Sequence, residues 1–335
     1  RESVLGMQHP TVGVQFRNLA ALLKTQGRYP EAEPLFRQSL VISEKVYGPN
    51  HTEVAIALNN YGQLLSHMGR NDEAERMYRK ALAIDENTLG AFHPDVATDL
   101  NNLGALLSDM GRYSDAQPLY ERCLEIDIKA LGPEHPDVAR SLTNLGRLMR
   151  QQSRYAEALP LYERALNIFE KAYGKEHVAV AMTLNSLGQL LRTMGRYDEA
   201  EPLCQRSLNI WEQVYGKDHP AVGTQLNNLG ALMSDIGRYS EAIPLFERAL
   251  SIRLLTLGPN HHLTVATKAW LHTIKTQQSA AEGKDQAGIN KLSAGSIPLS
   301  PMSPAKQRGH GENGDVSTSG IDQMGHTGRM GEVEW

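Results

Sequence analysis

One spacing constrains what this chain can fold into: histidine recurs every 42 residues without an insertion or deletion. These histidines are His9, His51, His93, His135, His177, His219 and His261. Arginine keeps the same spacing, in Arg28, Arg70, Arg112, Arg154, Arg196 and Arg238. Self-similarity at such a period is typical of a solenoid, in which each unit buries its apolar face only against its neighbours.

Each unit has the pattern of two helices joined by a tight turn. In the third unit, from His93 to Glu134, Pro94 suits a first helical turn because its φ is already fixed. Gly111 can end that helix, since glycine readily adopts positive φ, and a second helix is expected from about residue 113 to Gly132. The first helix is indicated by apolar residues at spacings of three and four, namely Val96, Leu100, Leu103, Leu106, Leu107 and Met110.

Small residues mark the place where the two helices of a unit should meet. We expect Gly104 to face Ala116, with Leu103 and Tyr120 filling the space above and below them. One hairpin cannot bury both of its faces, so neighbouring hairpins must stack into a continuous core. The sequence therefore predicts an all-α fold, a right-handed superhelical solenoid of helical hairpins.

The repeats divide the chain into three parts. Residues 9–276 are expected to form the solenoid, with six full units followed by a capping helix from about Leu263 to Thr276. Residues 1–8 would be the remnant of a preceding repeat or a linker. Residues 277–335 are rich in Gly, Ser, Gln and Asp and lose the apolar periodicity. Because such a segment buries too little apolar area to offset its chain entropy, we expect a disordered tail.

The third unit carries a recognisable set of small and large residues: Leu100, Asn101, Asn102, Leu103, Gly104, Gly111, Arg112, Tyr113, Ala116, Tyr120 and Cys123. This set resembles the tetratricopeptide repeat, and the 42-residue length is that of the kinesin light chain and nephrocystin-3 class. Residues 201–208 and 215–222 are similar to kinesin light chain repeats in particular. The resemblance covers residues 9 to about 276.

Nothing in the chain points to catalysis, a metal or a cofactor. Equivalent histidines lie one repeat apart, which is too far for ligands that must sit roughly 2.0–2.3 Å from a shared ion. Each is instead expected to start a helix. Cys123 and Cys204 occupy core positions of second helices and are expected to be buried structural thiols. No glycine-rich phosphate loop or pair of catalytic carboxylates stands out from the repeat, so we expect no enzyme.

The resemblance implies that the first helix of each repeat lines a concave face that binds extended peptides. Its exposed positions include Asn18, Asn60, Asn102, Asn144 and Asn228, with Ser186 as the exception. A second asparagine often precedes these, at Asn59, Asn101, Asn185 and Asn227. An amide can both donate and accept, so such a series can bind a peptide backbone. The alternative is that these amides bond neighbouring groups and fix the superhelix.

The fourth repeat departs from the others in charge. Arg140, Asn144, Arg147 and Gln151 share one helix face by their spacing, and Arg150 and Arg192 border it. The equivalent residues of the third and sixth repeats are neutral or acidic. Because arginine binds carboxylates through two parallel hydrogen bonds, an acidic segment or a C-terminal carboxylate is the expected ligand. The alternative is a solvated charged face.

The sequence thus favours a non-catalytic scaffold that binds peptide segments of partner proteins. The resemblance suggests a motor–cargo adaptor like kinesin light chain, joined to kinesin heavy chain through a region N-terminal to this one. A regulatory module of a larger signalling protein is a second interpretation. A helical-repeat RNA-binding protein is less favoured, because the net charge is −4 and no basic stripe recurs in every unit. No membrane span is expected, and the two cysteines fit a reducing, cytoplasmic setting.

Overall fold

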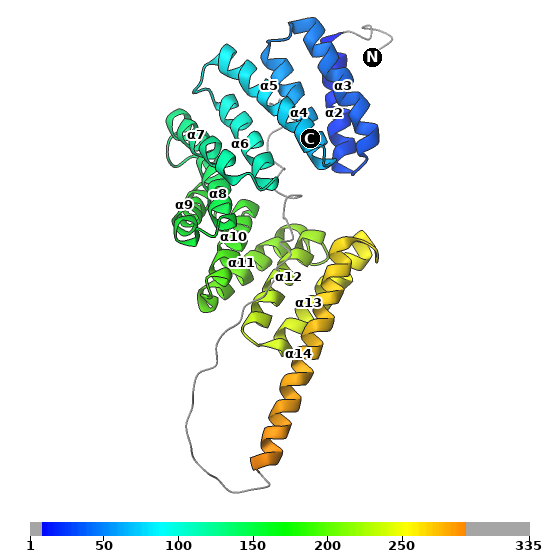
Figure 1. Cartoon of the computed structure of the whole chain (residues 1–335), viewed down its shortest axis with the longest axis vertical. Helices are drawn as coiled ribbons and strands as arrows, with labels where there is room; N and C mark the ends of the chain where they lie inside the picture. Colours follow the sequence, from blue (N-terminus) through cyan, green and yellow to red (C-terminus); the bar gives the residue numbers. More distant parts are fainter. Residues whose placement is uncertain (1–8, 293–335) are drawn as a thin grey trace. The chain divides into compact units, whose positions relative to one another are not determined.

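The computed structural model describes residues 9–292, which form 13 helices and no strand (Figure 1). The helices pair into hairpins that stack in chain order, which confirms the predicted all-α solenoid of helical hairpins. The repeats pack into one compact unit that ends at Gly283. The helices are α2 (Pro10–Thr25), α3 (Tyr29–Tyr47), α4 (Thr52–His67), α5 (Asn71–Leu89), α6 (Pro94–Asp109), α7 (Tyr113–Leu131), α8 (Pro136–Gln151), α9 (Tyr155–Tyr173), α10 (Val178–Thr193), α11 (Tyr197–Tyr215), α12 (Pro220–Asp235), α13 (Tyr239–Leu257) and α14 (His262–Leu292).

The recurrent histidine is the residue that caps each first helix. In the fourth repeat, the His135 Nδ1 atom accepts a hydrogen bond of 3.2 Å from the backbone N–H of Asp137. A side-chain acceptor at this place satisfies one of the N–H groups that a helix start leaves without a partner. The same bond recurs at all seven histidines of the 42-residue spacing, so their predicted structural role is confirmed.

In the five hairpins from α4–α5 to α12–α13, a tyrosine, a phenylalanine or a cysteine of the second helix fills the space beside a glycine of the first; the first hairpin has Ala20 at the position of this glycine. Ala116 is fully buried as expected, but a Cβ added at Gly104 would lie 3.2 Å from the Tyr120 ring. Gly104 therefore has no room for a side chain, because the Tyr120 ring packs against it. The sequence had predicted the smaller Ala116 as the residue that faces Gly104. Both cysteines are buried in this core, and burial raises the pKa of Cys123 to about 12 and that of Cys204 to about 11.

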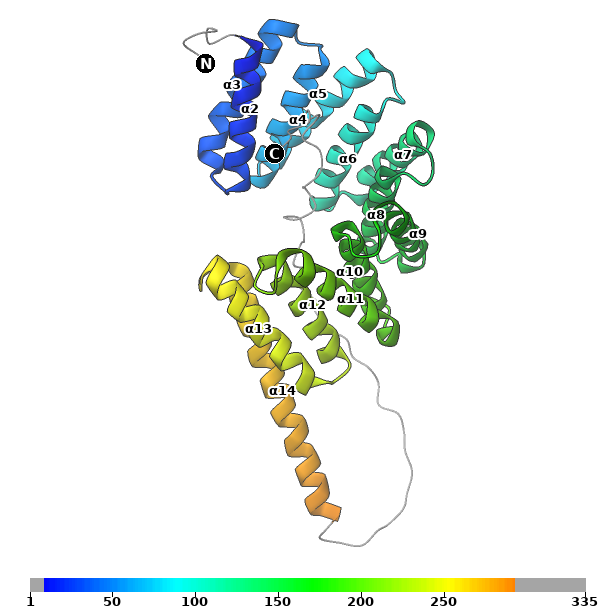
Figure 2. The same cartoon turned by 180° about the vertical axis from the view of Figure 1, so that it is seen from behind.

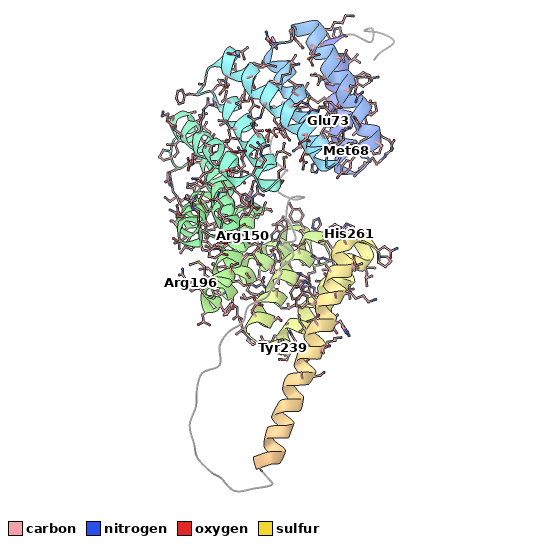
Figure 3. The ribbon with its side chains drawn as sticks, viewed as in Figure 1. Met68, Glu73, Arg150, Arg196, Tyr239 and His261 are labelled. Carbon is pink, nitrogen blue, oxygen red and sulfur yellow. The ribbon has the colours of Figure 1, made fainter. Side chains whose placement is uncertain are left out.

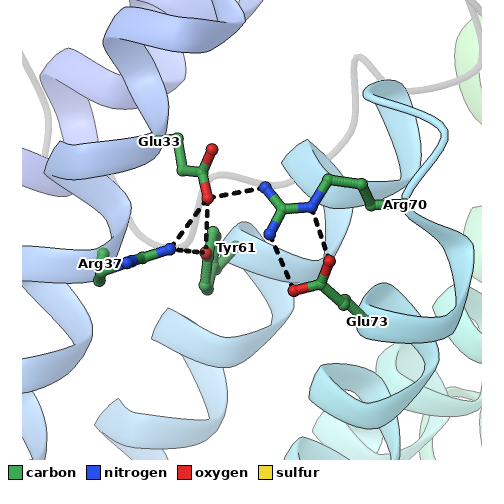
Figure 4. A network of polar contacts seen from close by, with 5 residues as sticks. All are labelled: Glu33, Arg37, Tyr61, Arg70 and Glu73. Carbon is green, nitrogen blue, oxygen red and sulfur yellow. Dashed lines mark hydrogen bonds and ion pairs between the residues drawn. The ribbon is translucent and has the colours of Figure 1, made fainter.

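In four of the hairpins the recurrent arginine forms a side-chain hydrogen bond with the preceding hairpin, whereas Arg196, among the described residues, bonds only Glu199 of its own helix. The Arg70 guanidinium donates to Glu73 on its own helix and, through Nη1, to Glu33 of the preceding second helix at 2.8 Å (Figure 4). Tyr61 and Arg37 donate to the same Glu33 oxygen. The hydrogen bond from Arg70 holds the pKa of Glu33 below its usual value. Comparable links join Arg112 to Glu75 and Gln117 to Arg154, and a further one joins Arg238 to Glu201.

The first helices form one row and the second helices another. Each of α2, α4, α6, α8 and α10 packs against the next first helix in addition to its own partner (Figures 1 and 2). Because they approach one another in this way, the first helices form a continuous surface on their side of the array. This surface, made of α2, α4, α6, α8, α10 and α12, is called the inner face below.

The last helix is longer than the sequence indicated. We expected a capping helix to end at Thr276 and the chain from residue 277 to be disordered, whereas α14 continues to Leu292. The helix continues past Thr276 because residues 277–292 contain no proline. Extending a helix that is already anchored also costs far less free energy than starting a new one. The rest of the predicted tail, residues 293–335, and the predicted remnant at residues 1–8 lie outside the described residues.

Candidate peptide-binding face

Direct polar bridges connect the first helices of successive repeats across the inner face. Asn144 Nδ2 donates to Asn101 Oδ1 at 2.6 Å and Ser108 Oγ donates to Gln151 Oε1 at 2.7 Å, both between α6 and α8. Between α10 and α12, Asn228 donates to Asn185 at 3.0 Å, and the Arg192 Nε atom lies 2.6 Å from the Asp235 carboxylate. Between α2 and α4, Lys24 donates to Gln63. These bonds fix the spacing of neighbouring repeats.

The predicted asparagine series is divided between these bridges and unbonded positions. Asn59 donates to Asp99, Asn60 donates to the backbone carbonyl of Ile56, and Asn227 accepts from Thr267. With the two bridging pairs, most of the series bonds within the array, as the structural alternative requires. Asn18 and Asn102 differ, because neither side chain makes a hydrogen bond within the described residues.

The predicted face of the fourth repeat also has internal partners. Arg140 forms an ion pair of 2.9 Å with Asp137, and its side chain keeps 43% of its surface exposed. Asn144 and Gln151 take part in the bridges to α6. Burial raises the pKa of the Tyr120 hydroxyl to about 12, and the positive charge of Arg147 only partly opposes this rise. A ligand at this face would therefore compete with, or add to, existing contacts.

The junction between α8 and α10 lacks the bridges that its neighbours have. Where the flanking junctions have asparagine pairs, Thr143 and Ser186 bond backbone carbonyls of their own helices. Arg150, labelled in Figure 3 where α8 meets α10, has no side-chain hydrogen bond or ion pair within the described residues. The Nε2 atom of Gln189 on α10 is buried and has no partner either.

Sequence reasoning gave Arg150 only as a border residue and did not single out Gln189. A usable signal existed, because Arg150 and Gln189 stand three whole repeats after Lys24 and Gln63. The latter two are hydrogen-bonded between α2 and α4. Arg150 and Gln189 therefore occupy the positions that correspond to this bonded pair.

Two buried carboxyl groups meet between the second and third repeats. Asp85 on α5 is 3% exposed and Asp99 on α6 is 1% exposed, and each has one oxygen without a hydrogen-bond partner. Burial raises the pKa of Asp85 to about 6 and that of Asp99 to about 8, and the negative charge of Asp95 adds to both shifts. One repeat later, Ser141 donates to Asp127 at 2.6 Å in the equivalent arrangement. Sequence reasoning missed this pair.

The tetratricopeptide repeat family matches residues 14–87, 53–129, 95–171, 148–203 and 179–255. The chain belongs to the tetratricopeptide repeat family. No curated protein sequence matches it. Among the residues that the structure describes, no three histidine, cysteine, aspartate or glutamate side chains are grouped to hold a metal ion. Of the helices between residues 9 and 292, none has both the length and the apolar content needed to cross a bilayer.

Several solved tetratricopeptide structures share the fold. The TPR-like repeats of a Podosopora anserina protein named as a kinesin light chain are 24% identical, with a TM-score of 0.53, and the match covers 62% of this chain and 98% of that one. BtubC (BKLC) from P. vanneervenii is 25% identical, with a TM-score of 0.56 and coverage of 71% and 93%. Rap protein, complexed with Competence and Sporulation Factor, is 16% identical, with a TM-score of 0.54 and coverage of 79% and 75%. The predicted resemblance to kinesin light chain-type repeats is thereby confirmed.

Proposed function

We propose that this tetratricopeptide chain is a non-catalytic scaffold that binds an extended segment of a partner protein along its inner face. The observation that carries the proposal is a set of polar side chains on this face that have no hydrogen-bond partner among residues 9–292: Asn18, Asn102 and Arg150. Several of their equivalents in other repeats, Asn144, Asn228, Lys24 and Arg192, take part in bridges between first helices. A peptide offers backbone carbonyls and N–H groups at short intervals, which suit amides that both donate and accept.

We propose further that the segment is acidic. The inner face of the fourth repeat presents Arg140, Arg147 and Arg150, whereas the matching positions of the third and sixth repeats carry no arginine. Guanidinium groups favour carboxylates through charge-assisted hydrogen bonds. In this proposal Asn144 and Gln151 keep their bridges to α6 and contact the ligand with their remaining hydrogen-bonding capacity.

The experiment is a selection of random 12-residue peptides against the purified full chain, followed by dissociation constants from fluorescence anisotropy. Asn102→Ala should weaken the selected peptides about threefold to tenfold, because one bond to the backbone is lost. Asn87→Ala, on the second helix α5, is the matched control and should leave binding unchanged. The proposal fails if no peptide binds, or if Asn102→Ala and the control behave alike.

A motor–cargo adaptor is the finer form of this proposal. It rests on the kinesin light chain-type repeats and requires an interaction with kinesin heavy chain. Co-sedimentation of the chain, extended by any N-terminal region that its gene encodes, with a kinesin heavy-chain stalk would test it. Binding of RNA at physiological salt, measured on filters, would instead favour the RNA-binding alternative.

A further inference from the structure

A hollow of about 340 Å³ opens between the second helices α11 and α13. Its floor is apolar and contains Leu229 and Met233 of α12, which are 4% and 3% exposed. Its rim is polar, with Glu201 and Gln205 on α11 and Glu241 on α13. Successive second helices approach one another less closely than successive first helices do, which leaves room for such a space. The hollow therefore lies between second helices and is separate from the inner face.

Three repeats earlier, the same place is occupied by an arginine of the chain itself. Arg79 on α5 stands at the position of Gln205 and donates to the Oε1 atom of Glu75, from Nε at 2.9 Å and from Nη2 at 2.7 Å. Arg112 on α7 donates to the other oxygen of that carboxylate, Oε2, at 2.7 Å. Both oxygens of Glu75 are thus paired with a guanidinium. The first junction has two such cations on one carboxylate as well, namely Arg37 and Arg70 on Glu33.

The surroundings of the two places are otherwise closely matched. Five equivalent positions carry the same residue: Glu75 and Glu201, Leu103 and Leu229, Ser114 and Ser240, Pro118 and Pro244, and Leu119 and Leu245. The second arginine is therefore the main chemical difference. Its replacement, Gln205, does not bond Glu201 and instead donates to Asn209 on its own helix at 2.9 Å.

Glu201 consequently has one of the two cations that Glu75 has. Arg238 donates to Glu201 Oε2 at 2.7 Å, and among the described residues nothing donates to Oε1. The Glu201 side chain is 38% exposed, whereas that of Glu75 is 16% exposed. Arg238 also pairs with Glu241. Two carboxylates thus share one guanidinium at this rim, and a negative charge remains beside an apolar floor.

We propose that this hollow is a docking site for an arginine side chain of a partner protein. The guanidinium donates to Glu201 Oε1 in the way that Arg79 donates to Glu75, and it neutralises the charge left at the rim. The aliphatic stem of the arginine lies over Leu229 and Met233. This site is independent of peptide binding on the inner face, because it is built mainly from α11 and α13.

The first test titrates N-acetyl-arginine N-methylamide into the full chain, labelled with ¹⁵N and with ¹³C at the methionine methyl groups. N-acetyl-citrulline N-methylamide is the uncharged match, and the corresponding lysine compound is the second cation. We expect the Met233 methyl signal and the Arg238 Nε–H signal to shift with the arginine probe, less with lysine and not with citrulline. If no signal moves, or if either comparison probe acts as strongly as arginine, the site is refuted.

The second test fills the hollow from within. Gln205→Arg copies Arg79 and should weaken the arginine probe about tenfold or more, as should Glu201→Gln, which removes the charge. Gln213→Arg adds the same charge at an exposed position of α11 outside the hollow and should leave the response unchanged. Position 205 tolerates arginine in the equivalent helices α3 and α5, and circular dichroism checks each variant. Probe binding to Gln205→Arg within twofold of the parent would contradict the assignment.

The third test asks whether a polypeptide supplies the arginine. Random 12-residue peptides are selected for binding to the parent and against binding to Gln205→Arg. The survivors should share an arginine, and its replacement by citrulline should weaken them about tenfold or more. If no peptide discriminates between the two proteins, or if those that do lack arginine, the docking of a partner is overturned. Peptides of the inner face bind both proteins and respond to Asn102→Ala, so either claim can fail while the other stands.

Discussion

Replacing Asp99 by serine should remove a pH dependence that the buried pair gives to this fold. Asp85 and Asp99 lie against each other with one unpartnered oxygen each. Asn59 donates to Asp99 from α4, while Asp95 and His93 face the pair from the start of α6. Two adjacent buried carboxyl groups cannot both ionise cheaply, so one must keep its proton. The substitution copies the next junction, where Ser141 donates to Asp127.

The sign follows from proton binding. Both folded-state pKa values, about 6 for Asp85 and about 8 for Asp99, lie above the unfolded value of 3.8. The folded state therefore binds more protons than the unfolded state at pH values between 3.8 and about 8. The contribution of the pair to the unfolding free energy is complete below about pH 4 and is lost as the pH rises through about 6 and then about 8.

The magnitude follows from the same shifts. At about 1.4 kcal/mol per pKa unit, ionising Asp99 in the closed junction would cost about 6 kcal/mol. Repeats can separate locally without global unfolding, which admits water and limits the cost. We therefore expect the parent to lose about 2–4 kcal/mol relative to Asp99→Ser between pH 5 and pH 9.

The assay is urea unfolding followed by circular dichroism at 222 nm, for the parent, Asp99→Ser and the control Asp218→Asn. Asp218 is exposed in the loop before α12, and its replacement changes the net charge equally. The control should follow the parent at every pH. If Asp99→Ser loses as much stability as the parent on going from pH 5 to pH 9, the buried pair does not share a proton in the folded state.

Three further outcomes are expected. His135→Ala should lower the unfolding free energy by about 1 kcal/mol through loss of the cap on α8, whereas His135→Asn should keep most of it, as measured by urea unfolding. Gly188→Ala should cost about 1–3 kcal/mol, because the new Cβ would lie 2.5 Å from Cys204 Sγ, and the added change Cys204→Ala should recover part of it; no recovery would contradict the steric reason. Truncation after Gln278 should shift Tm by less than about 3 °C, since Ile274 is the last buried side chain up to residue 280; a larger fall would mean that later residues pack against the array.

The repeating hairpin could be predicted from the sequence because its causes are local. The capping histidine acts on an N–H two residues away, and the turn glycine determines only its own φ. Apolar residues at spacings of three and four define the buried side of a helix without reference to the rest of the chain. The same argument failed at α14, where no local signal marks how far an anchored helix continues.

The candidate site was only partly predictable, because the hydrogen bonds that shape it join side chains of different repeats. Helical spacing put Arg140, Asn144 and Arg147 on one face, but it could not show which side chains already have partners 37 to 43 residues away. Whether Asn144 reaches Asn101 or Arg150 stays unpaired depends on distances between helices of successive repeats. Those distances follow from the packing of whole hairpins, and no pattern within one unit contains them. Local patterns therefore define the hairpin and its period, whereas packing between hairpins selects which polar groups remain free to bind a ligand.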